Sequence, residues 1–466
     1  MTRRRILVAT ADTLGPRMAG PAIRAWHLAD CLAADHDVEL VTTGLCELES
    51  VRFNVCAVDE AALRGAVRRC EVLICQGWLL AGRPWIVLSD VIIVCDIYDP
   101  LHLEQLEHSR DHGGEKWRRE VHGAVAVLNE QLRRGDFFTC ASEKQRAFWL
   151  GQLAGMGRVN PANYGADPTL RRLIDVVPFG CSDAAPVAER SAIRGVLPGV
   201  DDTSKVVLWG GGIYNWFDPI TLIKAVDRLR HRHPELRLVF MGVQHPNPEV
   251  PTMRVAVEAQ QLAHQLGLAG SVIHFNEGWV PFAERQELLL DADIGVSSHF
   301  DHLETEFSFR TRILDYLWAG LPMVLTAGDF FAELIDQRAA GLVVPAQDVA
   351  ALEAALDELL SDPKLFQRCA EQSRNLGLEL RWSEVTEPLQ RFCQRPARAP
   401  DMLDELQLQL IHHQLVILTK TRSALWHNLR SAVRMLRDDG PKAACSRIVE
   451  RALGLVGRAA GRIRPD

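Results

Sequence analysis

Several features that would narrow the function are missing from this chain. It contains no apolar stretch of about 20 residues, the length that a bilayer-spanning helix requires. It has neither a GxGxxG nor a Walker-type glycine loop, so it carries no dinucleotide or ATP signature. Positive charge is also in short supply, since the net charge is −8. This balance argues against a nucleic-acid-binding protein.

The cysteines lack the spacing of disulfide or zinc sites. Eleven are scattered without a CxxC pair or Cys/His ligand spacing, and most lie in apolar runs such as "VLICQG" and "VIIVCDIY". This pattern indicates buried thiols in a reducing cytosol. The start, "MTRRRILVAT", has an apolar run of only about six residues, shorter than a secretory signal, and is better explained as a strand. We therefore expect a cytoplasmic protein.

Length and composition predict two globular domains and an appendage. A chain of 466 residues is too long for one ordinary core. The apolar fraction of 47% and charged fraction of 24% are typical of soluble globular proteins.

Short buried strands alternate with helices through the first half. "RILVAT" and "DVELVTT" are strands, and "GPAIRAWHLADCLAA" between them is a helix with Pro21 near its start. "CEVLICQG", "DVIIVCDIYD", "GDFFTCAS" and "LIDVVPFGCSD" continue the strands, and the alternation predicts a parallel sheet flanked by helices. We assign residues 1–190 to this first domain.

The same alternation restarts at "KVVLWGGG" and runs through "LRLVFMG", "SVIHFNEGWV", "DIGVSS", "PMVLT" and "GLVVP", with helices between. We assign residues 191–396 to a second domain of the same kind. The fold class expected is α/β, with two doubly wound domains facing a central cleft. Ligands in such sheets bind at the carboxyl ends of the strands.

The residues after 396 differ in character. Residues 397–466 are predicted to be helical, with leucines near one face and arginines on another: Leu418, Leu425, Leu429, Leu436, Arg447, Arg451, Arg458 and Arg462. Residues 420–466 hold eleven Lys/Arg against four Asp/Glu. A basic amphipathic extension can lie on an anionic membrane surface, and it can equally pack on its own domain or on a dimer partner.

Two glycine turns fall where a strand gives way to a helix. "WGGGIYNW" includes Gly211, Gly212 and Asn215, and "MAGPAIR" in the first half places Gly20 at a helix start. Glycine permits close backbone approach, and a following helix N-terminus offers N–H groups to a phosphate. One such turn is routine, but one in each half favours a shared phosphate-binding cleft.

The stretch "FSFRTRILDYLWAGLPMV" is locally unfavourable. Arg310 and Arg312 stand at the start of a helix, where the helix dipole disfavours positive charge. A bound diphosphate would resolve this conflict through charge-assisted hydrogen bonds. Asp315 could then accept from ribose hydroxyls, although an Arg312–Asp315 surface pair is the simpler alternative.

Acidic and imidazole groups follow a strand in the first half. "VIIVCDIYDPLHLEQLE" places Asp99 and His102 near the expected cleft, where they could orient a hydroxyl or accept its proton. Turn-forming aspartates are the alternative explanation.

Four segments together resemble a known family. "RTRILDYLWAGLPMV", "VVLWGGG", "EGWVP" and "GLVVP" resemble family 4 glycosyltransferases of the GT-B fold, a similarity covering roughly residues 4–395. In that family a Glu-x7-Glu element binds the donor, its first acid meeting the sugar and its second the ribose. The resemblance puts Asp315 at the ribose position. The family position of the first acid falls on residue 307, which is a phenylalanine in this chain, and the nearest carboxylates are those of Glu306 and Glu304.

The sequence departs from the family at the glycine turn. Family members usually follow that turn with an Arg and a Lys that hold the diphosphate, whereas "NWFDP" stands here. Arg310 and Arg312 are the natural substitutes.

The resemblance implies a retaining transferase that uses a nucleotide-diphosphate sugar and needs no bound metal. The implied acceptor, bound by the first half, is a glycan or lipid-linked glycan of a bacterial surface polysaccharide. That setting would suit a basic extension at the inner membrane leaflet. We expect Asp99, His102 and Glu306 as the catalytic candidates. "DAD" at 291–293 imitates a metal motif, but it precedes a buried strand, and we reject it.

Two other functions remain open. A nucleotide-sugar epimerase of the same fold would hydrolyse donor without an acceptor. A non-catalytic partner subunit would bind no nucleotide, and the missing Arg/Lys pair favours that alternative.

Overall fold

The computed structural model describes residues 3–243 and 253–403. The chain divides into two compact units, residues 1–399 and 400–466. In the second unit only the short turn η3 (Pro400–Met402) is described. The expected amphipathic helices of residues 404–466, including the basic stretch 420–466, lie outside the described residues.

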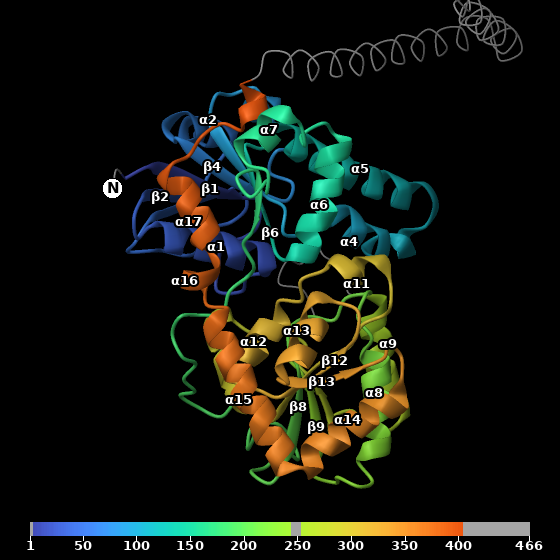
Figure 1. Ribbon diagram of the computed structural model, residues 1–466. Coiled ribbons are helices and arrows are strands. Elements are labelled where there is room, and N and C mark those ends of the chain that lie inside the picture. Colours follow the sequence, from blue (N-terminus) through green and yellow to red (C-terminus); the bar gives the residue numbers. More distant parts are fainter. Residues whose placement is uncertain (1–2, 244–252, 404–466) are drawn as a thin grey trace, which may run out of the picture. The chain divides into compact units, whose positions relative to one another are not determined.

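The first half is built on a sheet of seven parallel strands (Figure 1). Their spatial order is β3-β2-β1-β4-β5-β6-β7. The strands are β1 (Arg5–Thr10), β2 (Asp37–Thr42), β3 (Asn54–Ala57), β4 (Val72–Gln76), β5 (Ile92–Asp96), β6 (Phe137–Cys140) and β7 (Ile174–Val176). Central strands such as β4 are buried along their whole length, as expected of a parallel sheet covered on both faces. The short edge strand β3 was not predicted.

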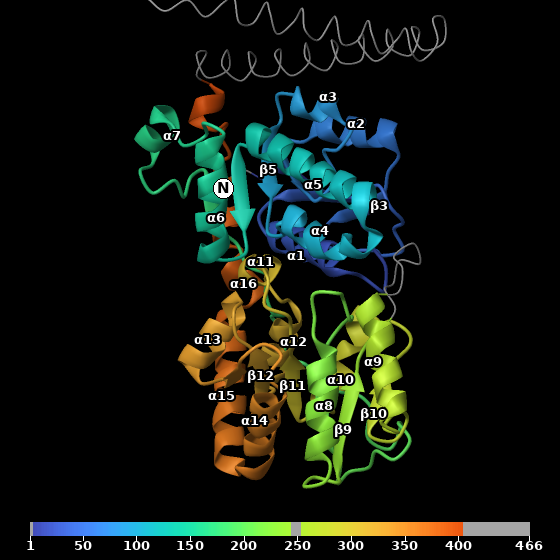
Figure 2. The same cartoon turned by 90° about the vertical axis from the view of Figure 1, so that its right-hand side faces the viewer.

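Helices cover this sheet. They are α1 (Gly20–Leu32), α2 (Glu60–Arg69), α3 (Pro84–Val87), α4 (Leu101–His108), α5 (Gly114–Arg134), α6 (Glu143–Gly155) and α7 (Pro161–Ala166). The helix α1 has Pro21 in its first turn, as predicted, because proline needs no hydrogen-bond acceptor there. Helices α4 and α5 pack against each other (Figure 2).

The second half repeats the plan with six parallel strands in the order β10-β9-β8-β11-β12-β13. The strands are β8 (Lys205–Trp209), β9 (Leu236–Phe240), β10 (Ile273–Phe275), β11 (Ile294–Ser297), β12 (Met323–Thr326) and β13 (Gly341–Val344). The helices are α8 (Pro219–Leu229), α9 (Arg254–Gln265), α10 (Arg285–Leu290), α11 (Leu303–Phe307), α12 (Arg312–Ala319), α13 (Phe330–Arg338), α14 (Val349–Ser361) and α15 (Pro363–Glu379). The predicted fold class of two doubly wound domains is confirmed.

Each sheet has one point where the strand order reverses. In the first half β1 lies between β2 and β4, and in the second β8 lies between β9 and β11. Such a switch point leaves a crevice at the carboxyl ends of the strands, where ligands of doubly wound sheets bind. Both glycine-containing turns of the sequence follow these two strands.

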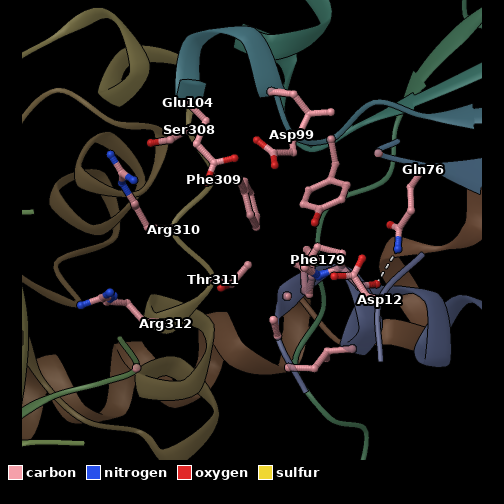
Figure 3. A pocket seen from close by; sticks show the side chains of 18 of the residues that line it. Asp12, Gln76, Asp99, Glu104, Phe179, Ser308, Phe309, Arg310, Thr311 and Arg312 are labelled. Atoms are coloured by element: carbon pink, nitrogen blue, oxygen red, sulfur yellow. Dashed lines mark hydrogen bonds between the residues drawn. The ribbon is translucent and has the colours of Figure 1, made fainter. Parts of the chain in front are cut away.

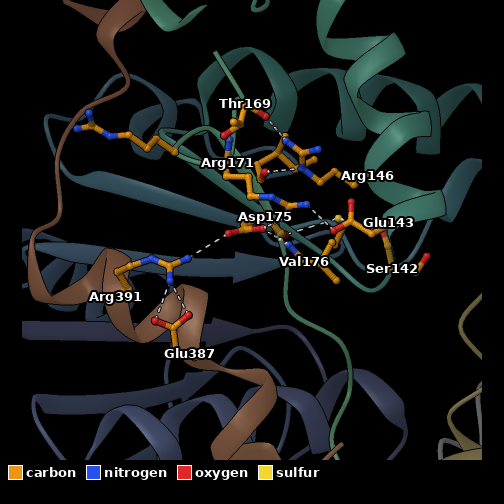
Figure 4. Close-up of polar contacts among 12 residues, drawn as sticks. Ser142, Glu143, Arg146, Thr169, Arg171, Asp175, Val176, Glu387 and Arg391 are labelled. Atoms are coloured by element: carbon orange, nitrogen blue, oxygen red, sulfur yellow. Dashed lines mark hydrogen bonds and ion pairs between the residues drawn. The ribbon is translucent and has the colours of Figure 1, made fainter. Parts of the chain in front are cut away.

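The last helices return to the first half. They are α16 (Trp382–Val385) and α17 (Glu387–Gln394). Phe392 stacks on Phe137 at 4.5 Å between ring centroids. Arg391 joins Asp175 of β7 at 3.3 Å and also holds Glu387 of its own helix (Figure 4). Residues 382–394 therefore pack against the first sheet, although they follow the second in sequence.

Among the described residues, no helix combines the length and the apolar character needed to cross a bilayer.

Candidate active site

One cavity of about 610 Å³ is lined by both halves. Its wall includes the turns after β1, β4 and β5 from the first half, and the turn after β8 with the segment 308–312 from the second. The candidate residues that line it are Gly20, Asp99, Gly211, Gly212, Glu304, Arg310, Arg312 and Asp315. The switch points of the two sheets thus supply one shared site.

The glycine turn after β8 is held in place by α12. Gly210 donates its N–H to the hydroxyl of Tyr316 at 2.7 Å. Gly211 has a φ of +74°, in the left-handed region that favours glycine. The turn is therefore fixed on one side, while Gly211 and Gly212 face the cavity.

Among the residues that the structure describes, Arg312 is a buried cation without an acidic partner. One of its terminal nitrogens donates to the Gly212 carbonyl at 2.7 Å, and the guanidinium lies 3.9 Å from the ring centre of Phe217. Within the described residues, the other terminal nitrogen, Nη1, is buried with no hydrogen-bond partner. Burial lowers the pKa of this guanidinium to about 10. An orphaned buried donor on a cation is costly, and an anion in the cavity would satisfy it.

The N-terminus of α12 adds positive potential beside the cavity. The helix begins after Thr311, and no side chain caps it. The N–H groups of Ile313 and Leu314 already donate to the carbonyls of Arg310 and Thr311, at 3.0 and 3.1 Å. The helix dipole still favours negative charge at this end. Ser308, Phe309 and Thr311 line the cavity beside this end.

Arg310 and Glu304, both expected to meet the donor, meet each other instead. Their side chains form two hydrogen bonds of 3.0 and 2.6 Å and are almost completely buried. Figure 3 shows the side chains of Arg310 and Arg312 turned away from Asp99 and Asp12. Since Arg310 is neutralised by Glu304, Arg312 is the arginine of the pair that is left for a ligand.

Asp315 also has a partner within the protein. Arg285 of α10 donates to it at 3.0 Å, while its guanidinium lies 3.6 Å from the ring centre of Phe282. Both Asp315 and Arg285 line the cavity. The alternative Arg312–Asp315 pair is not formed. Sequence reasoning missed Arg285, since nothing in its short helix distinguishes it from a surface arginine.

The first-half end of the cavity is acidic. Asp99 and Glu104 point their carboxyl groups toward one another (Figure 3). Burial raises the pKa of Asp99 to about 6, and burial together with Asp99 raises the pKa of Glu104. The pair therefore binds a proton more tightly than two free carboxyl groups would.

Behind this end lies a buried ion pair. Arg24 of α1 donates to both carboxylate oxygens of Asp96, at 2.6 and 2.8 Å, and both side chains are completely buried. Arg24 also donates to the carbonyls of Val177 and Pro178. The pair joins α1 to β5 and fixes the base of the cavity.

Three predicted residues lie outside the cavity wall: His102, Asn215 and Glu306. His102 packs on Phe148, and burial lowers its pKa to about 4. Glu306 is half-exposed and lies 3.7 Å from Lys144.

Asn215 and Phe307 are engaged elsewhere. Asn215 donates to Asp111 at 3.1 Å. Phe307, where the family resemblance would put the first acid, packs on Phe148 at 4.6 Å between ring centres.

No cluster of three His, Cys, Asp or Glu side chains in the described part of the chain could hold a metal ion. The aspartates of "DAD" serve the structure instead. Asp291 accepts from the backbone N–H groups of residues 192–194, and Asp293 pairs with Arg194 at 2.6 Å.

Comparison with known proteins finds a family model that matches part of the second half. Residues 204–362 match the family model described as glycosyl transferases group 1. No curated protein matches the chain in a sequence comparison.

Solved structures resemble the chain along most of its length. WaaG, a glycosyltransferase involved in lipopolysaccharide biosynthesis, is 16% identical with a TM-score of 0.57, over 83% of this chain and 98% of its own. HepE of Anabaena, in complex with UDP and glucose, is 14% identical with a TM-score of 0.59, over 84% and 99%. Sucrose-phosphate synthase of Thermosynechococcus elongatus is 15% identical with a TM-score of 0.56, over 89% and 100%. The chain thus has the fold of these proteins.

Proposed function

We propose that this chain, whose residues 204–362 match the family model of group 1 glycosyl transferases and whose fold is that of the glycosyltransferase WaaG, transfers a sugar from a nucleotide-diphosphate sugar with retention of the anomeric configuration. The observation that carries this proposal is Arg312, a buried guanidinium with an unpartnered nitrogen beside the glycine turn. A diphosphate supplies the missing acceptor and the missing negative charge in one group.

The donor lies across the second half. Its diphosphate contacts the turn at Gly211 and Gly212, the uncapped start of α12 and Arg312. Its ribose hydroxyls donate to Asp315, whose position Arg285 fixes. The buried Arg310–Glu304 pair holds the segment between α11 and α12 in shape.

The chemistry is displacement of the nucleoside diphosphate. The acceptor hydroxyl oxygen bonds to the anomeric carbon on the same face from which the diphosphate leaves, as the bond from that carbon to the diphosphate breaks. The bonding electrons leave with the diphosphate, and the hydroxyl proton passes to Asp99. Negative charge grows on the leaving group, so the fixed positive groups around it lower the barrier.

Those groups are a guanidinium and a helix N-terminus, and we propose that the transfer needs no metal ion. The family resemblance supports both this and retention of configuration.

The structural relatives support the proposed donor class and setting. HepE is described in complexes with UDP, UDP-glucose, and UDP with glucose. WaaG is described as acting in lipopolysaccharide biosynthesis. We propose that this chain likewise builds a cell-surface polysaccharide on a glycan or lipid-linked acceptor. It would act in the cytoplasm, at the inner membrane leaflet, with residues 420–466 on the anionic surface.

A thermal-shift screen against UDP, GDP, dTDP and ADP sugars tests the proposal. We expect one nucleotide series to raise the melting temperature of the wild-type protein, and to raise that of Arg312→Met by clearly less at the same concentration. Arg232→Met is the matched control, since Arg232 lies on the surface of the same half and pairs with Glu353 and Asp357.

Other results would favour the alternatives. A melting-temperature shift in Arg312→Met as large as in the wild type would show that the diphosphate does not bind at Arg312. Release of free sugar without any acceptor would favour an epimerase, and no shift with any nucleotide would favour a non-catalytic subunit.

A further inference from the structure

The two halves contribute opposite charges to the cavity. Among the lining residues that the structure describes, the first half supplies four carboxyl groups and neither a lysine nor an arginine. The four are Asp12, Asp96, Asp99 and Glu104. The second half supplies three arginines and two acids: Arg285, Arg310, Arg312, Glu304 and Asp315. Two of these arginines are paired with the two acids, and Arg312 supplies the remaining positive charge. A negatively charged group is therefore favoured at one end of the cavity and disfavoured at the other.

Most of the acidic charge in the first half is uncompensated. Asp96 is neutralised by Arg24. Within the described residues Asp12, Asp99 and Glu104 take part in no ion pair. Asp12 is bonded to the hydroxyl of Thr10 at 3.3 Å. The pKa of Asp12, like those of Asp99 and Glu104, is raised chiefly by burial. A second negative charge placed among these groups would be strongly unfavourable.

Gln76 gives independent evidence for a ligand at this end. Its side chain is 6% exposed, and its nitrogen donates to the Pro21 carbonyl at 2.6 Å. Its Oε1 is buried with no partner in the described residues, and the residue lines the cavity. Figure 3 shows Gln76 close to Asp12, at the end away from the arginines. An orphaned acceptor requires a donor, which a hydroxyl provides and a phosphate dianion does not.

Aromatic faces complete this part of the wall. Tyr98, Phe179 and the partly exposed Trp78 are also first-half residues of the cavity wall. An apolar surface beside several hydrogen-bond acceptors matches a molecule with C–H faces and many hydroxyl donors, which is the chemistry of a sugar ring.

We propose that the first half binds an acceptor that is an uncharged sugar ring. The hydroxyl groups of this sugar donate hydrogen bonds to Asp12, Gln76 and the Asp99–Glu104 pair. The site rejects sugars that carry phosphate or carboxylate next to the reacting hydroxyl. This inference rests on the proposed function, because it names the acceptor class of the same cavity. If the acceptor is attached to a lipid diphosphate, its reacting sugar must lie far enough from that diphosphate for the diphosphate charge to stay outside the cavity.

Saturation-transfer NMR on the full-length chain, with and without UDP, tests the charge rule directly. The probes are methyl glucoside, glucosamine, glucuronic acid and glucose 6-phosphate, matched in ring and different in charge. We expect the neutral sugar to bind at least tenfold more tightly than glucuronic acid or glucose 6-phosphate. Tighter binding of glucosamine alone would replace the neutral class by an amino sugar and overturn the proposal. So would equal binding of all four probes, or binding of none.

A charge-removing variant separates electrostatics from shape. Asp12→Asn/Glu104→Gln keeps the size of both side chains, and we expect it to reduce the discrimination against glucose 6-phosphate by about tenfold. The control Glu333→Gln removes an exposed acid outside the cavity and should leave the discrimination unchanged. Discrimination that survives in the double variant contradicts the proposal.

UDP binding is measured separately, as the rise in melting temperature that UDP produces. If UDP fails to bind while the sugars still discriminate, the proposed donor function fails and the acceptor inference stands.

Discussion

The two halves of this molecule share a fold and differ in charge. Each is a doubly wound parallel sheet whose central strand, β1 or β8, ends in a turn at the common cavity. The first half adds unpaired carboxyl groups there, and the second adds a buried guanidinium. The fold places both sets of loops, while the residues in those loops decide what each half can bind. Substitutions confined to one half should therefore have effects that can be distinguished from those of substitutions in the other half.

The largest effect is expected from the buried ion pair of the first half. Arg24→Met leaves the carboxylate of Asp96 without its cation in a completely buried site. Loss of one partner of such a pair costs about 3–5 kcal/mol of unfolding free energy. Urea unfolding measures it. Because the pair acts as a unit, Arg24→Met/Asp96→Asn should lose less than the sum of the two single variants. Additive losses would contradict this account of the pair.

A chemical effect follows at Asp99. If this carboxylate accepts the acceptor proton, Asp99→Asn should lower kcat by about 100-fold and leave the affinity for the nucleotide unchanged. In the wild type, kcat/KM should rise as the pH increases through about 6, where Asp99 ionises. This rise of kcat/KM with pH should be absent in Asp99→Asn. An unchanged pH profile would exclude Asp99 as the base.

The same residue has a consequence for stability. The folded protein binds the Asp99 proton more tightly than the unfolded chain, because the pKa is raised from 3.8 to about 6. Its stabilising contribution is complete below pH 3.8 and is lost as the pH rises through about 6. Unfolding of the wild type and of Asp99→Asn across this range should show the difference.

In the second half, Arg312→Met should weaken donor binding by about 10- to 100-fold, the range expected for charge-assisted hydrogen bonds. Its stability should stay the same or rise, because the variant removes a buried cation with no acidic partner. Calorimetry with UDP and thermal unfolding measure the two effects. Strong destabilisation with normal UDP affinity would make Arg312 a structural residue.

The smallest effect is expected at Asp315. Asp315→Asn keeps a hydrogen-bond acceptor for the ribose but loses the ion pair with Arg285. Donor affinity should fall by no more than about tenfold, since one hydrogen bond contributes about 0.5–1.5 kcal/mol. Comparing UDP with 2′-deoxy-UDP in both proteins shows whether the carboxylate meets the ribose. Identical preferences in both proteins would place the ribose elsewhere.

Local sequence patterns were sufficient to predict most of the fold. Pro21 in a first helical turn and the restart at Lys205 are local features, and the structure has a helix and a strand there. The strand β3 was missed because four residues at a sheet edge carry little periodicity. The return of α16 and α17 to the first half depends on contacts such as Arg391–Asp175, across 216 residues.

The site was harder to predict, because its charges are paired through space. The conflict at the start of α12 drew attention to Arg310 and Arg312, and both line the cavity. Sequence spacing did not reveal that Glu304 folds back onto Arg310. Likewise, nothing near Asp315 indicated Arg285, which comes from another helix.

The orphaned Oε1 of Gln76 and the packing of His102 on Phe148 are tertiary facts of the same kind. Local patterns thus located the cavity loops, and only the folded structure distinguished paired side chains from unpaired ones.

A crystal structure of the full-length chain with UDP tests the division between the halves most directly. The account predicts the diphosphate within hydrogen-bonding distance of Arg312 Nη1 and of the backbone at Gly211, Gly212 and the start of α12. A diphosphate found among Asp12, Gln76 and Asp99 would contradict it.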